Sequence, residues 1–402
     1  MKFTTVSLSI LALTTFAKAD LLHSYQFHGN LEPSVGVFPL LPKEGLANPI
    51  GFSPTYSSAT VGSTTKQVVN FSFNQGFLAR FGMVPEPGLD YGNQYTILWD
   101  IKVDALQDGR WLSFYNTNKS NSNDGDMFLD LTRGFGISGD YAGIAGYALG
   151  QWHRIVLVVD LFRAGTTDDP RMSIYVDGNL ANQVPLGAGL DGRWALYTER
   201  LLEGDEFQGT YLLMDESGES ASGQLSQVAF WNESLEASEV AALGLVGSAV
   251  GPNSVGFDAV DVLEGEIFDG GLESIASSDD NVLALFNDPT TLAGSLKLSA
   301  NIGIGSASSL AAVVETSAAR PGLQESIAFR NQTNGNWEVK GGRVATPYDW
   351  FFKSGAGSAS ALYVAANGTV EVRLTWNPIN DEDPATDGWL MSLDAARLEF
   401  TP

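Results

Sequence analysis

Apolar and polar side chains alternate along much of the chain, which is the pattern of β-strands that bury one face. In YTILWDIKVD, residues 95–104, the alternate positions from Ile97 to Val103 are apolar. HRIVLVVD, residues 153–160, is almost wholly apolar, as expected for a strand that is covered on both faces. Many short strands separated by turn-rich gaps predict an all-β protein made of antiparallel sandwiches or jelly rolls.

The stretch RMSIYVDGNL, residues 171–180, raises the question of what Asp177 does. Alternation up to residue 176 predicts a strand, and Asp177-Gly178 follows it at once. An acid at the end of a strand can be a catalytic group, or it can stabilise the turn that follows the strand. Gly tolerates positive φ and Asp caps its own turn, so we predict that Asp177 turns the chain into a hairpin.

One short helix interrupts the strands. The segment SLEASEVAALG, residues 234–244, offers Ser238 as N-cap, Glu239 in the first turn and Gly244 just past the end. These signals predict a helix that starts near Ser238.

The domain prediction follows from the spacing of these elements. Residues 247–256 are small and rich in Gly, Ser and Pro, which predicts a linker. A second strand-rich block then runs to the end, with clean alternation in SLKLSANI and TVEVRLTW. We expect a first sandwich over residues 20–246 and a second, C-terminal β-sandwich over residues 257–402.

The first nineteen residues read as an export signal. Lys2 gives a positive start, residues 6–16 are apolar, and Ala17-Lys18-Ala19 is a small-x-small cleavage pattern. The apolar run is shorter than the roughly 20 residues that span a bilayer. We therefore predict a signal peptide over residues 1–19, no transmembrane segment, and a secreted protein that is extracellular, periplasmic or at the cell surface.

Charge and cysteine content narrow the function. The chain has 47 acidic and 22 basic residues and a formal net charge of −25. Such a chain repels phosphate, so we expect no nucleic-acid partner. It has no cysteine, which excludes disulfides and thiol chemistry. Export without disulfides is more typical of a bacterial protein than of an animal one.

Four stretches occur in a familiar order: LLHSYQFHGNL, QWHRIVLVVD, MSIYVDGNLA and SQVAFWNESLEASEVAAL. Through them, residues 20–246 resemble the laminin-G-like jelly roll of the concanavalin A-like lectin/glucanase superfamily. Residues 191–243 resemble the variant of this domain seen in secreted proteins of environmental bacteria. The resemblance implies that Asp177-Gly178 belongs to a hairpin of the back sheet. Residues 257–402 resemble uncharacterised β-sandwich modules of exported bacterial proteins, which implies no activity.

Catalysis in this fold would need paired carboxylates. Sandwich glucanases that resemble it carry them at alternate positions of one strand, as Glu-x-Asp-x-Glu, on either side of the sugar bond. No strand-like segment here has that pattern. The nearest acids fall in turns and Gly-broken loops: Glu203, Asp205, Glu206, Asp215, Glu216 and Glu219. We predict no catalytic residue and no enzyme.

Calcium is the one cofactor that the sequence leaves open, because clustered oxygens on a turn are the ligands it prefers. Three segments of the chain have such clusters. Two of them are the acidic turns 215–219 and 380–387, and the third is the segment NSNDGDMF. The chain departs from the resembled family at two acidic positions, which are His28 and the pair Ser226-Gln227. The alternative to calcium binding is that each cluster is an ordinary turn whose polar side chains are solvated. The leading candidate ligands lie in NSNDGDMF: Asn121, Asn123, Asp124 and Asp126.

Sugar binding needs aromatic platforms beside amides or carboxylates, although Trp and Tyr are also ordinary sandwich core. The candidate ligand-binding residues are Asn116, Asn118, Tyr141, Trp194 and Tyr197. The predicted function is an exported, non-catalytic binding protein that engages a polysaccharide, a surface glycan or a surface protein. Two alternatives stay open: a structural or adhesive component of a surface assembly, and a divergent glycoside hydrolase or polysaccharide lyase.

Overall fold

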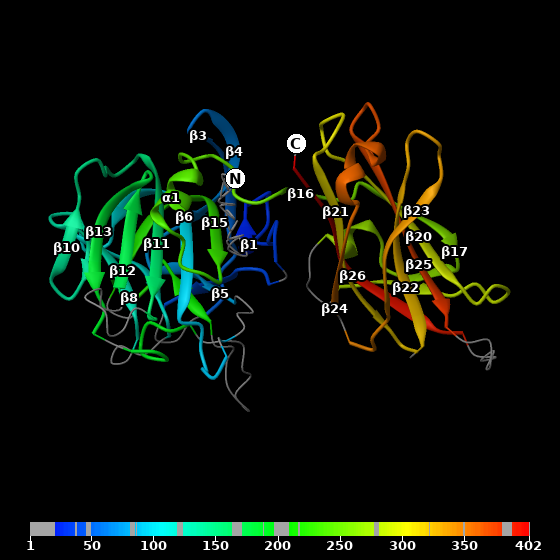
Figure 1. Ribbon diagram of the computed structural model, residues 1–402, viewed down its shortest axis with the longest axis horizontal. Coiled ribbons are helices and arrows are strands. Elements are labelled where there is room, and N and C mark those ends of the chain that lie inside the picture. Colours follow the sequence, from blue (N-terminus) through cyan, green and yellow to red (C-terminus); the bar gives the residue numbers. More distant parts are fainter. Residues whose placement is uncertain are drawn as a thin grey trace, which may run out of the picture.

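The protein consists of antiparallel sheets that pack in pairs as two β-sandwiches (Figure 1). Strands β1–β15 make the first sandwich and β16–β26 the second. This confirms the all-β class that the alternation predicts. The computed structural model describes residues 21–36, 38–45, 50–80, 85, 87–118, 124–162, 171–187, 189–196, 209–215, 218–276, 281–320, 322–348, 350–379 and 388–401.

The larger sheet of the first sandwich has eight strands and contains the most apolar segments. At its centre β6 (Gln94–Leu106) pairs with β11 (Trp152–Asp160), and Ile97 lies opposite Leu157. The remaining strands are β12 (Arg171–Val176) and β13 (Asn179–Pro185) on one side, and β15 (Ala221–Trp231), β4 (Thr64–Phe71), β3 (Thr55–Val61) and β1 (Leu21–Tyr25) on the other.

The facing sheet has seven strands, and the core lies between the two sheets. Trp99 of the larger sheet meets Phe114 edge-on, with ring centroids 5.6 Å apart, and both are fully buried. The strand order is β10 (Asp140–Gly143), β9 (Gly134–Ile137), β8 (Asp126–Asp130), β7 (Trp111–Asn116), β14 (Thr210–Leu212), β5 (Gln75–Ala79) and β2 (Leu41–Glu44).

The second sandwich pairs a six-stranded with a five-stranded sheet around its own core, which includes the fully buried Trp376. Two 3₁₀ turns, η1 (Leu272–Ile275) and η2 (Gly357–Tyr363), join its strands. The first sheet contains β18 (Glu266–Asp269), β19 (Leu283–Phe286), β26 (Leu390–Thr401), β21 (Ser309–Ala318), β24 (Trp350–Gly355) and β16 (Asn253–Gly256). The second contains β17 (Ala259–Glu264), β20 (Gly294–Asn301), β25 (Thr369–Pro378), β22 (Leu323–Arg330) and β23 (Trp337–Val344).

The predicted helix is present as α1 (Ala237–Ala242), but its predicted N-cap is wrong. The helix begins one residue before Ser238, with Glu236 as N-cap. The Glu239 carboxylate reaches back and accepts a hydrogen bond from the Glu236 amide at 2.8 Å. This reciprocal arrangement caps the helix in place of the Ser hydroxyl.

The segment after α1 is fastened to the first sandwich. Arg154, fully buried beside Asp100, donates hydrogen bonds to the carbonyls of Leu243 at 2.5 Å and Ser248 at 2.6 Å. The Asp100 carboxylate in turn accepts from the Gly247 amide at 3.0 Å. A buried guanidinium needs its hydrogen bonds filled, so this network holds residues 243–248 against the sheet.

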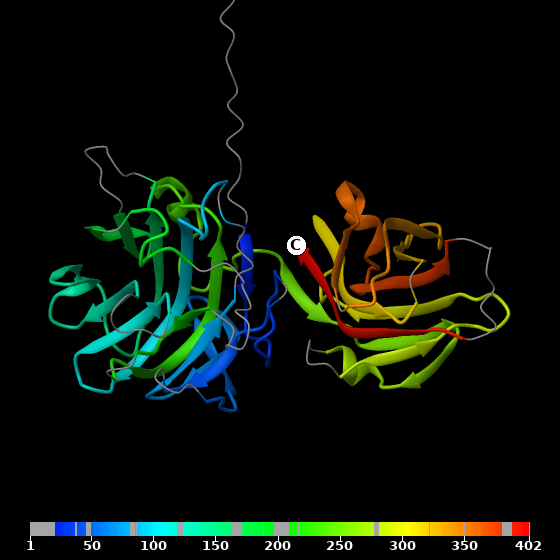
Figure 2. The same ribbon diagram turned by 90° about the horizontal axis from the view of Figure 1, so that it is seen from below.

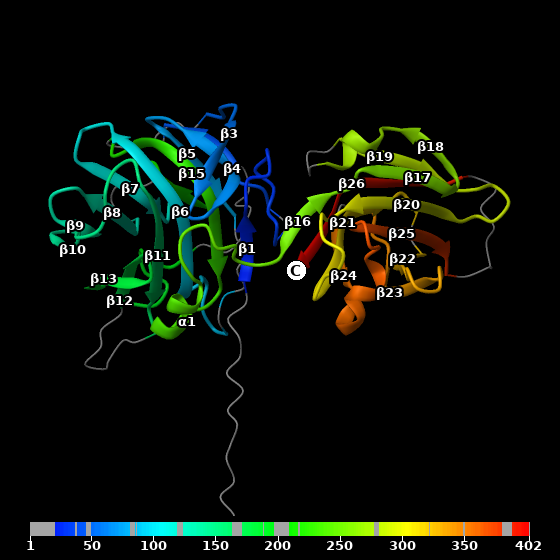
Figure 3. The same ribbon diagram turned by 90° about the horizontal axis from the view of Figure 1, so that it is seen from above.

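The predicted linker therefore needs correction at its C-terminal end. Residues 253–256 form β16 and pair with β26, with Asn253 opposite Phe400. Just before them, the Pro252 carbonyl accepts a hydrogen bond from Gln26 of the first sandwich at 3.2 Å. Figures 2 and 3 show the chain crossing once between the sandwiches and running directly into β16. The pattern of small residues did not reveal this pairing because it is long-range.

The predicted signal peptide, residues 1–19, lies outside the described residues. Among the residues that are described, no helix is long and apolar enough to cross a bilayer.

Candidate functional site

The outer face of the seven-stranded sheet displays side chains from alternate positions of its strands. Along β8, Met127 and Leu129 are buried in the core, so Phe128 and Asp130 lie on the opposite, outer face. Trp111 of β7 is paired with Asp130 across the ladder and shares that face. The strand pairing therefore brings two aromatic rings and one carboxylate together.

Three aromatic residues of this face form what we call the aromatic patch: Trp111, Phe128 and Tyr141. Tyr141 arrives from β10, where it lies opposite Gly136 of β9. Its ring meets Trp111 edge-on at a centroid distance of 5.4 Å, and Phe128 meets Trp111 at 6.2 Å. All three rings are partly exposed, in contrast to the buried aromatic residues of the core.

Two arginines lie over the rings of the aromatic patch: both over Trp111, and Arg133 also over Tyr141. The Arg133 guanidinium lies 4.2 Å from the Tyr141 ring centroid, and that of Arg110 lies 4.7 Å from the Trp111 ring centroid. Their side chains are 41% and 45% exposed, so both cations are available to solvent. Contact of this kind is attractive because the face of an aromatic ring carries negative charge density.

Asp130 holds both arginines in place. Its Oδ2 accepts from Arg110 at 2.7 Å and from Arg133 at 2.6 Å, and its Oδ1 accepts from Arg110 at 3.1 Å. Thr132 donates to Oδ1 through its amide at 2.8 Å and its hydroxyl at 2.6 Å. The bonds from Arg110 first, and then those from Thr132 and Arg133, hold the pKa of Asp130 far below its usual range despite burial.

The two guanidiniums lie among several carboxylates. Asp130 binds both, Asp108 accepts from the Arg110 amide at 2.8 Å, and Asp126 shares the outer face of β8 with Asp130. In the part of the chain that the structure describes, Asp130 is the acceptor that bonds these guanidiniums, and it leaves N–H groups of both free to donate. Flat apolar rings beside such donors match the C–H faces and oxygens of a sugar.

The predicted sugar-binding residues differ in whether the structure places them at the surface site. Tyr141 belongs to the aromatic patch. Asn116 is fully buried, and its amide donates to the Met214 carbonyl at 2.6 Å, so it does not reach solvent. Trp194 is only 6% exposed and packs in the core. Asn118 lies just beyond β7, half-buried, and Tyr197 lies outside the described residues.

The calcium candidates are only partly described. Asn121 and Asn123 lie outside the described residues. Asp124 is 4% exposed, and Asp126 lies 3.7 Å from the Arg193 guanidinium. Within the residues that the structure describes, no group of three or more acidic or histidine side chains is arranged to hold a metal ion. Calcium binding by this loop stays a prediction.

Sequence reasoning missed most of the site. Trp111, Phe128, Arg110, Arg133 and Asp130 were not among the candidates. One signal was present: the tetrapeptide Asp-Gly-Arg-Trp, 108–111, puts a cation next to an aromatic residue at the start of a strand. The contact between Trp111 and Tyr141 was not visible, because it depends on the order of strands in the sheet.

Asp177 serves the turn, as predicted. It adopts a positive φ of 50° between β12 and β13. Its carboxylate accepts from the Arg154 amide at 2.9 Å and lies 2.8 Å from Nδ1 of His153. Burial alone would raise the pKa of Asp177, but the hydrogen bonds from His153 and the Arg154 amide outweigh it and lower the pKa. Both partners are structural neighbours in the sheet.

Two of the acids that we considered for catalysis, Asp215 and Glu219, are among the described residues. Asp215 follows β14, and Glu219 precedes β15 with its carbonyl accepting from the Ser113 amide at 2.9 Å. Glu203, Asp205, Glu206 and Glu216 lie outside the described residues.

Comparison with known proteins gives partial likenesses to solved structures. Domain 4 of AbnA, an extracellular arabinanase of Geobacillus stearothermophilus solved with arabinotriose, is 16% identical, with a TM-score of 0.40, over 56% of this chain and 98% of that one. The sialidase of Trypanosoma rangeli is 14% identical, with a TM-score of 0.29, over 52% and 33%. A module of a Ruminococcus gnavus sialidase bound to sialyllactose is 15% identical, with a TM-score of 0.27, over 46% and 99%.

No protein-family model matches the chain, and no curated protein matches it either. The solved structures above are carbohydrate-active or carbohydrate-binding proteins by description. At these identities and TM-scores they assign no ligand to this chain.

Proposed function

We propose that this is an exported, non-catalytic protein that binds carbohydrate on the outer face of the seven-stranded sheet. The observation that carries the proposal is the aromatic patch with its two arginines, anchored by one buried aspartate. The parts of the aromatic rings that the guanidiniums leave exposed would contact the apolar face of a sugar ring. This removes that face from water at little entropic cost, because the rings sit on paired strands.

The guanidiniums of Arg110 and Arg133 would supply the hydrogen bonds. Asp130 anchors each through one edge, so their free N–H groups can donate to hydroxyl or carboxylate oxygens of the ligand. Anchoring reduces the side-chain freedom that binding would otherwise have to remove. In this arrangement the rings supply apolar contact, and the guanidiniums orient the ligand through hydrogen bonds. Neither role needs a catalytic group, which supports a binding site.

The finer assignments are part of the same proposal. The first sandwich is a laminin-G-like jelly roll, the chain is exported after removal of residues 1–19, and the protein is not an enzyme. The order of the four matched stretches and the apolar leader support the first two. The missing alternating carboxylates support the third.

A polysaccharide panel tests the proposal. Wild-type protein is run through affinity gels containing plant, algal or bacterial polysaccharides, beside Trp111→Ala and a matched control, Trp337→Ala. Trp337 lies on β23 of the second sandwich and also stacks against an arginine, Arg373, at 5.2 Å. We expect retardation of the wild type and of Trp337→Ala by the same polysaccharide, and its loss in Trp111→Ala. Equal retardation of all three, or none on any gel, would contradict the proposal.

A second candidate function is a structural part of a surface assembly. It is favoured by the edge strand β18, where Phe268 is 64% exposed and packs edge-on against Phe286 at 5.0 Å. The strand reads Glu-Ile-Phe-Asp, so exposed apolar side chains alternate with acids there, and an exposed edge strand can pair with another chain. Sedimentation analysis of wild type and Phe268→Ser tests it: concentration-dependent self-association that Phe268→Ser removes would support assembly over a free binding protein.

A further inference from the structure

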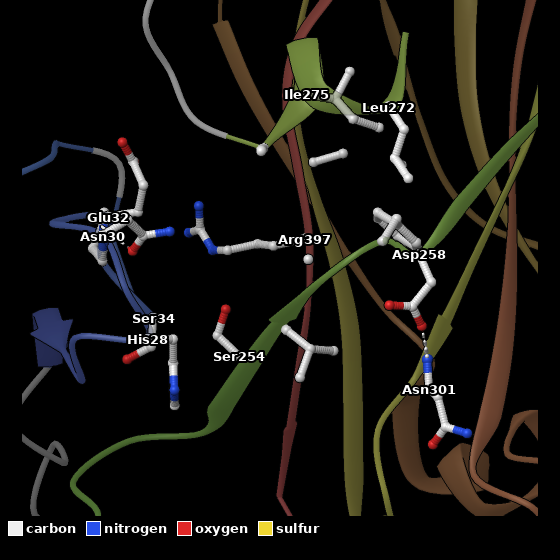
Figure 4. Close-up of a pocket in the computed structure, with 16 residues that line it drawn as sticks. His28, Asn30, Glu32, Ser34, Ser254, Asp258, Leu272, Ile275, Asn301 and Arg397 are labelled. Carbon is white, nitrogen blue, oxygen red and sulfur yellow. Dashed lines mark hydrogen bonds between the residues drawn. The ribbon is translucent and has the colours of Figure 1, made fainter. Parts of the chain in front are cut away.

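The two sandwiches enclose a cleft where they meet, and it lies away from the aromatic patch. The cavity measures about 440 Å³, within the range of roughly 300–1,000 Å³ that is usual for ligand sites. One wall is the loop that follows β1, with His28, Asn30 and Glu32. The other wall comes from β16 and β26, with Ser254 and Arg397 (Figure 4).

The cleft is preformed because little free chain separates its walls. The Val250 carbonyl accepts from the Ser24 hydroxyl at 2.7 Å, and the Pro252 carbonyl accepts from Gln26 at 3.2 Å, both within the first sandwich. The next residue, Asn253, already pairs with β26 of the second sandwich. A ligand that enters would therefore not have to order the two domains first.

Arg397 is the polar group in this cleft whose hydrogen bonding is incomplete. Its side chain is 12% exposed, and its guanidinium donates to the Gly36 carbonyl at 2.5 Å and to Glu399 at 3.1 Å. Its Nε is buried and has no acceptor among the described residues. Figure 4 shows the guanidinium pointing across the cavity toward Asn30 and Glu32. That buried nitrogen is out of reach of a ligand, but the exposed part of the Arg397 side chain faces the cleft and can donate a charge-assisted hydrogen bond to an acceptor oxygen there.

The other lining groups define what kind of molecule would carry that oxygen. The carboxylates of Glu32 and Asp258 oppose the single cation of Arg397, so the lining does not select an anion. Burial, and then the charge of Lys66, lowers the pKa of His28, which leaves the ring neutral at pH 7. Phe257 and Ile275 add apolar surface. Donors, acceptors and an apolar wall together fit a neutral polyhydroxylated molecule.

We propose that this junction cleft is a second binding site, for an uncharged sugar residue held between the two sandwiches. Arg397 donates to ring or hydroxyl oxygens, and Glu32 accepts from hydroxyl groups. The bound sugar would contact both domains at once, which distinguishes this site from the aromatic patch.

The test fills the cleft without disturbing the backbone. Gly256 lines the cavity, has no positive φ, and a Cβ added there meets no atom within 4 Å, so Gly256→Leu should fold and occupy the space. Gly187→Leu is the matched control, since Gly187 is equally open and lies in the first sandwich away from the cleft. The urea midpoints of both variants check folding. Glu32→Gln serves as a second variant if Gly256→Leu does not fold.

Each probe is added to the protein up to millimolar concentration, and binding is followed by saturation-transfer NMR. The probes are glucose, galactose, mannose, xylose, arabinose, cellobiose and lactose. The titrations use the Trp111→Ala background, so that binding at the aromatic patch does not contribute. In that background we expect at least one sugar to bind, equally well when Gly187→Leu is added, and with affinity reduced at least about tenfold when Gly256→Leu is added. Binding that survives the addition of Gly256→Leu would overturn the cleft assignment. So would the absence of binding by every probe, whatever the polysaccharide gels show.

Discussion

Asp130 and Asp177 show how a buried or half-buried carboxylate can organise its neighbours without catalysing anything. Asp130 is fully buried and fixes two arginines over aromatic rings at the surface. Asp177 fixes His153 and the Arg154 amide where the chain turns. Hydrogen bonds to the charged form lower the pKa of both residues, so each stabilises the fold in its ionised state.

Asp130→Asn tests this at the residue scale through pH. The folded-state pKa of Asp130 lies below its unfolded value, so its contribution to stability is complete above the unfolded pKa of about 3.9 and is lost as pH falls toward the folded value. Urea denaturation should therefore show the largest difference in the free energy of unfolding between wild type and variant near neutral pH. The difference should shrink as the pH falls below about 4.

Asp140→Asn is the control for that experiment, because Asp140 is exposed on β10 of the same sheet and its carboxylate makes no ion pair among the described residues. It should leave the stability profile close to that of the wild type. A difference between wild type and Asp130→Asn that stays constant from neutral to acid pH would show that charge on Asp130 does not matter.

At the scale of elements, alternation was enough to predict most strands but not what covers them. The alternation of β6 puts Thr96 and Asp100 on the face opposite Ile97 and Trp99, and both polar side chains are fully buried there. The Thr96 hydroxyl donates to the Glu233 carbonyl at 2.8 Å, and Asp100 binds Arg154 and the Gly247 amide. Local periodicity could not show this, because the covering segment is more than a hundred residues away in the sequence.

The aromatic patch was hidden for the same reason. The segments with Trp111 and Phe128, residues 111–117 and 127–132, were predictable as strands, and Tyr141 was among the candidate residues, but its strand β10 was not predicted. Trp111 and Tyr141 come into contact because of the sheet order β10-β9-β8-β7, and no short sequence motif encodes that order. Trp194 and Asn116 had the right residue types, but their burial removes them from a surface site.

Gly136→Ala tests how the β9–β10 pairing positions Tyr141. Gly136 has a φ of 156°, and an added Cβ would lie 1.8 Å from the Asp140 carbonyl oxygen, so the hairpin must shift. We expect a loss of at least about 1 kcal/mol in the free energy of unfolding and weaker retardation on the polysaccharide gel. Gly189→Ala, at an open position without positive φ, should change neither. Unchanged retardation in Gly136→Ala would mean that Tyr141 is not needed in its present place.

At the scale of the whole molecule, the two sandwiches are joined by a segment that belongs to both. Arg154 anchors residues 243–248 to the first sandwich, and β16 adds the following residues to the second. The Arg397 guanidinium adds a hydrogen bond to the Gly36 carbonyl across the junction. The result is a pair of domains with a defined relative placement, not two domains on a flexible tether.

Arg154→Met tests that connection. Removing one partner of a buried ion pair leaves the Asp100 carboxylate uncompensated, and the expected loss is about 3–5 kcal/mol in the free energy of unfolding. Small-angle scattering should also show a wider spread of domain separations. The double variant Asp100→Leu with Arg154→Met removes both charges and should recover part of the stability, but not the domain placement. A single variant as stable and as compact as the wild type would contradict the account.

The central claim is that Trp111 and its neighbours bind carbohydrate, and the dissociation constant of Trp111→Ala tests it most directly. Isothermal titration calorimetry would use the polysaccharide that retards the wild type, or oligosaccharides cut from it, against wild type, Trp111→Ala and Trp337→Ala. We predict that Trp111→Ala raises Kd at least about tenfold, or about 1.4 kcal/mol, with Trp337→Ala unchanged. A Trp111→Ala variant that binds with the wild-type Kd would contradict the claim that the outer face of the seven-stranded sheet is the binding site.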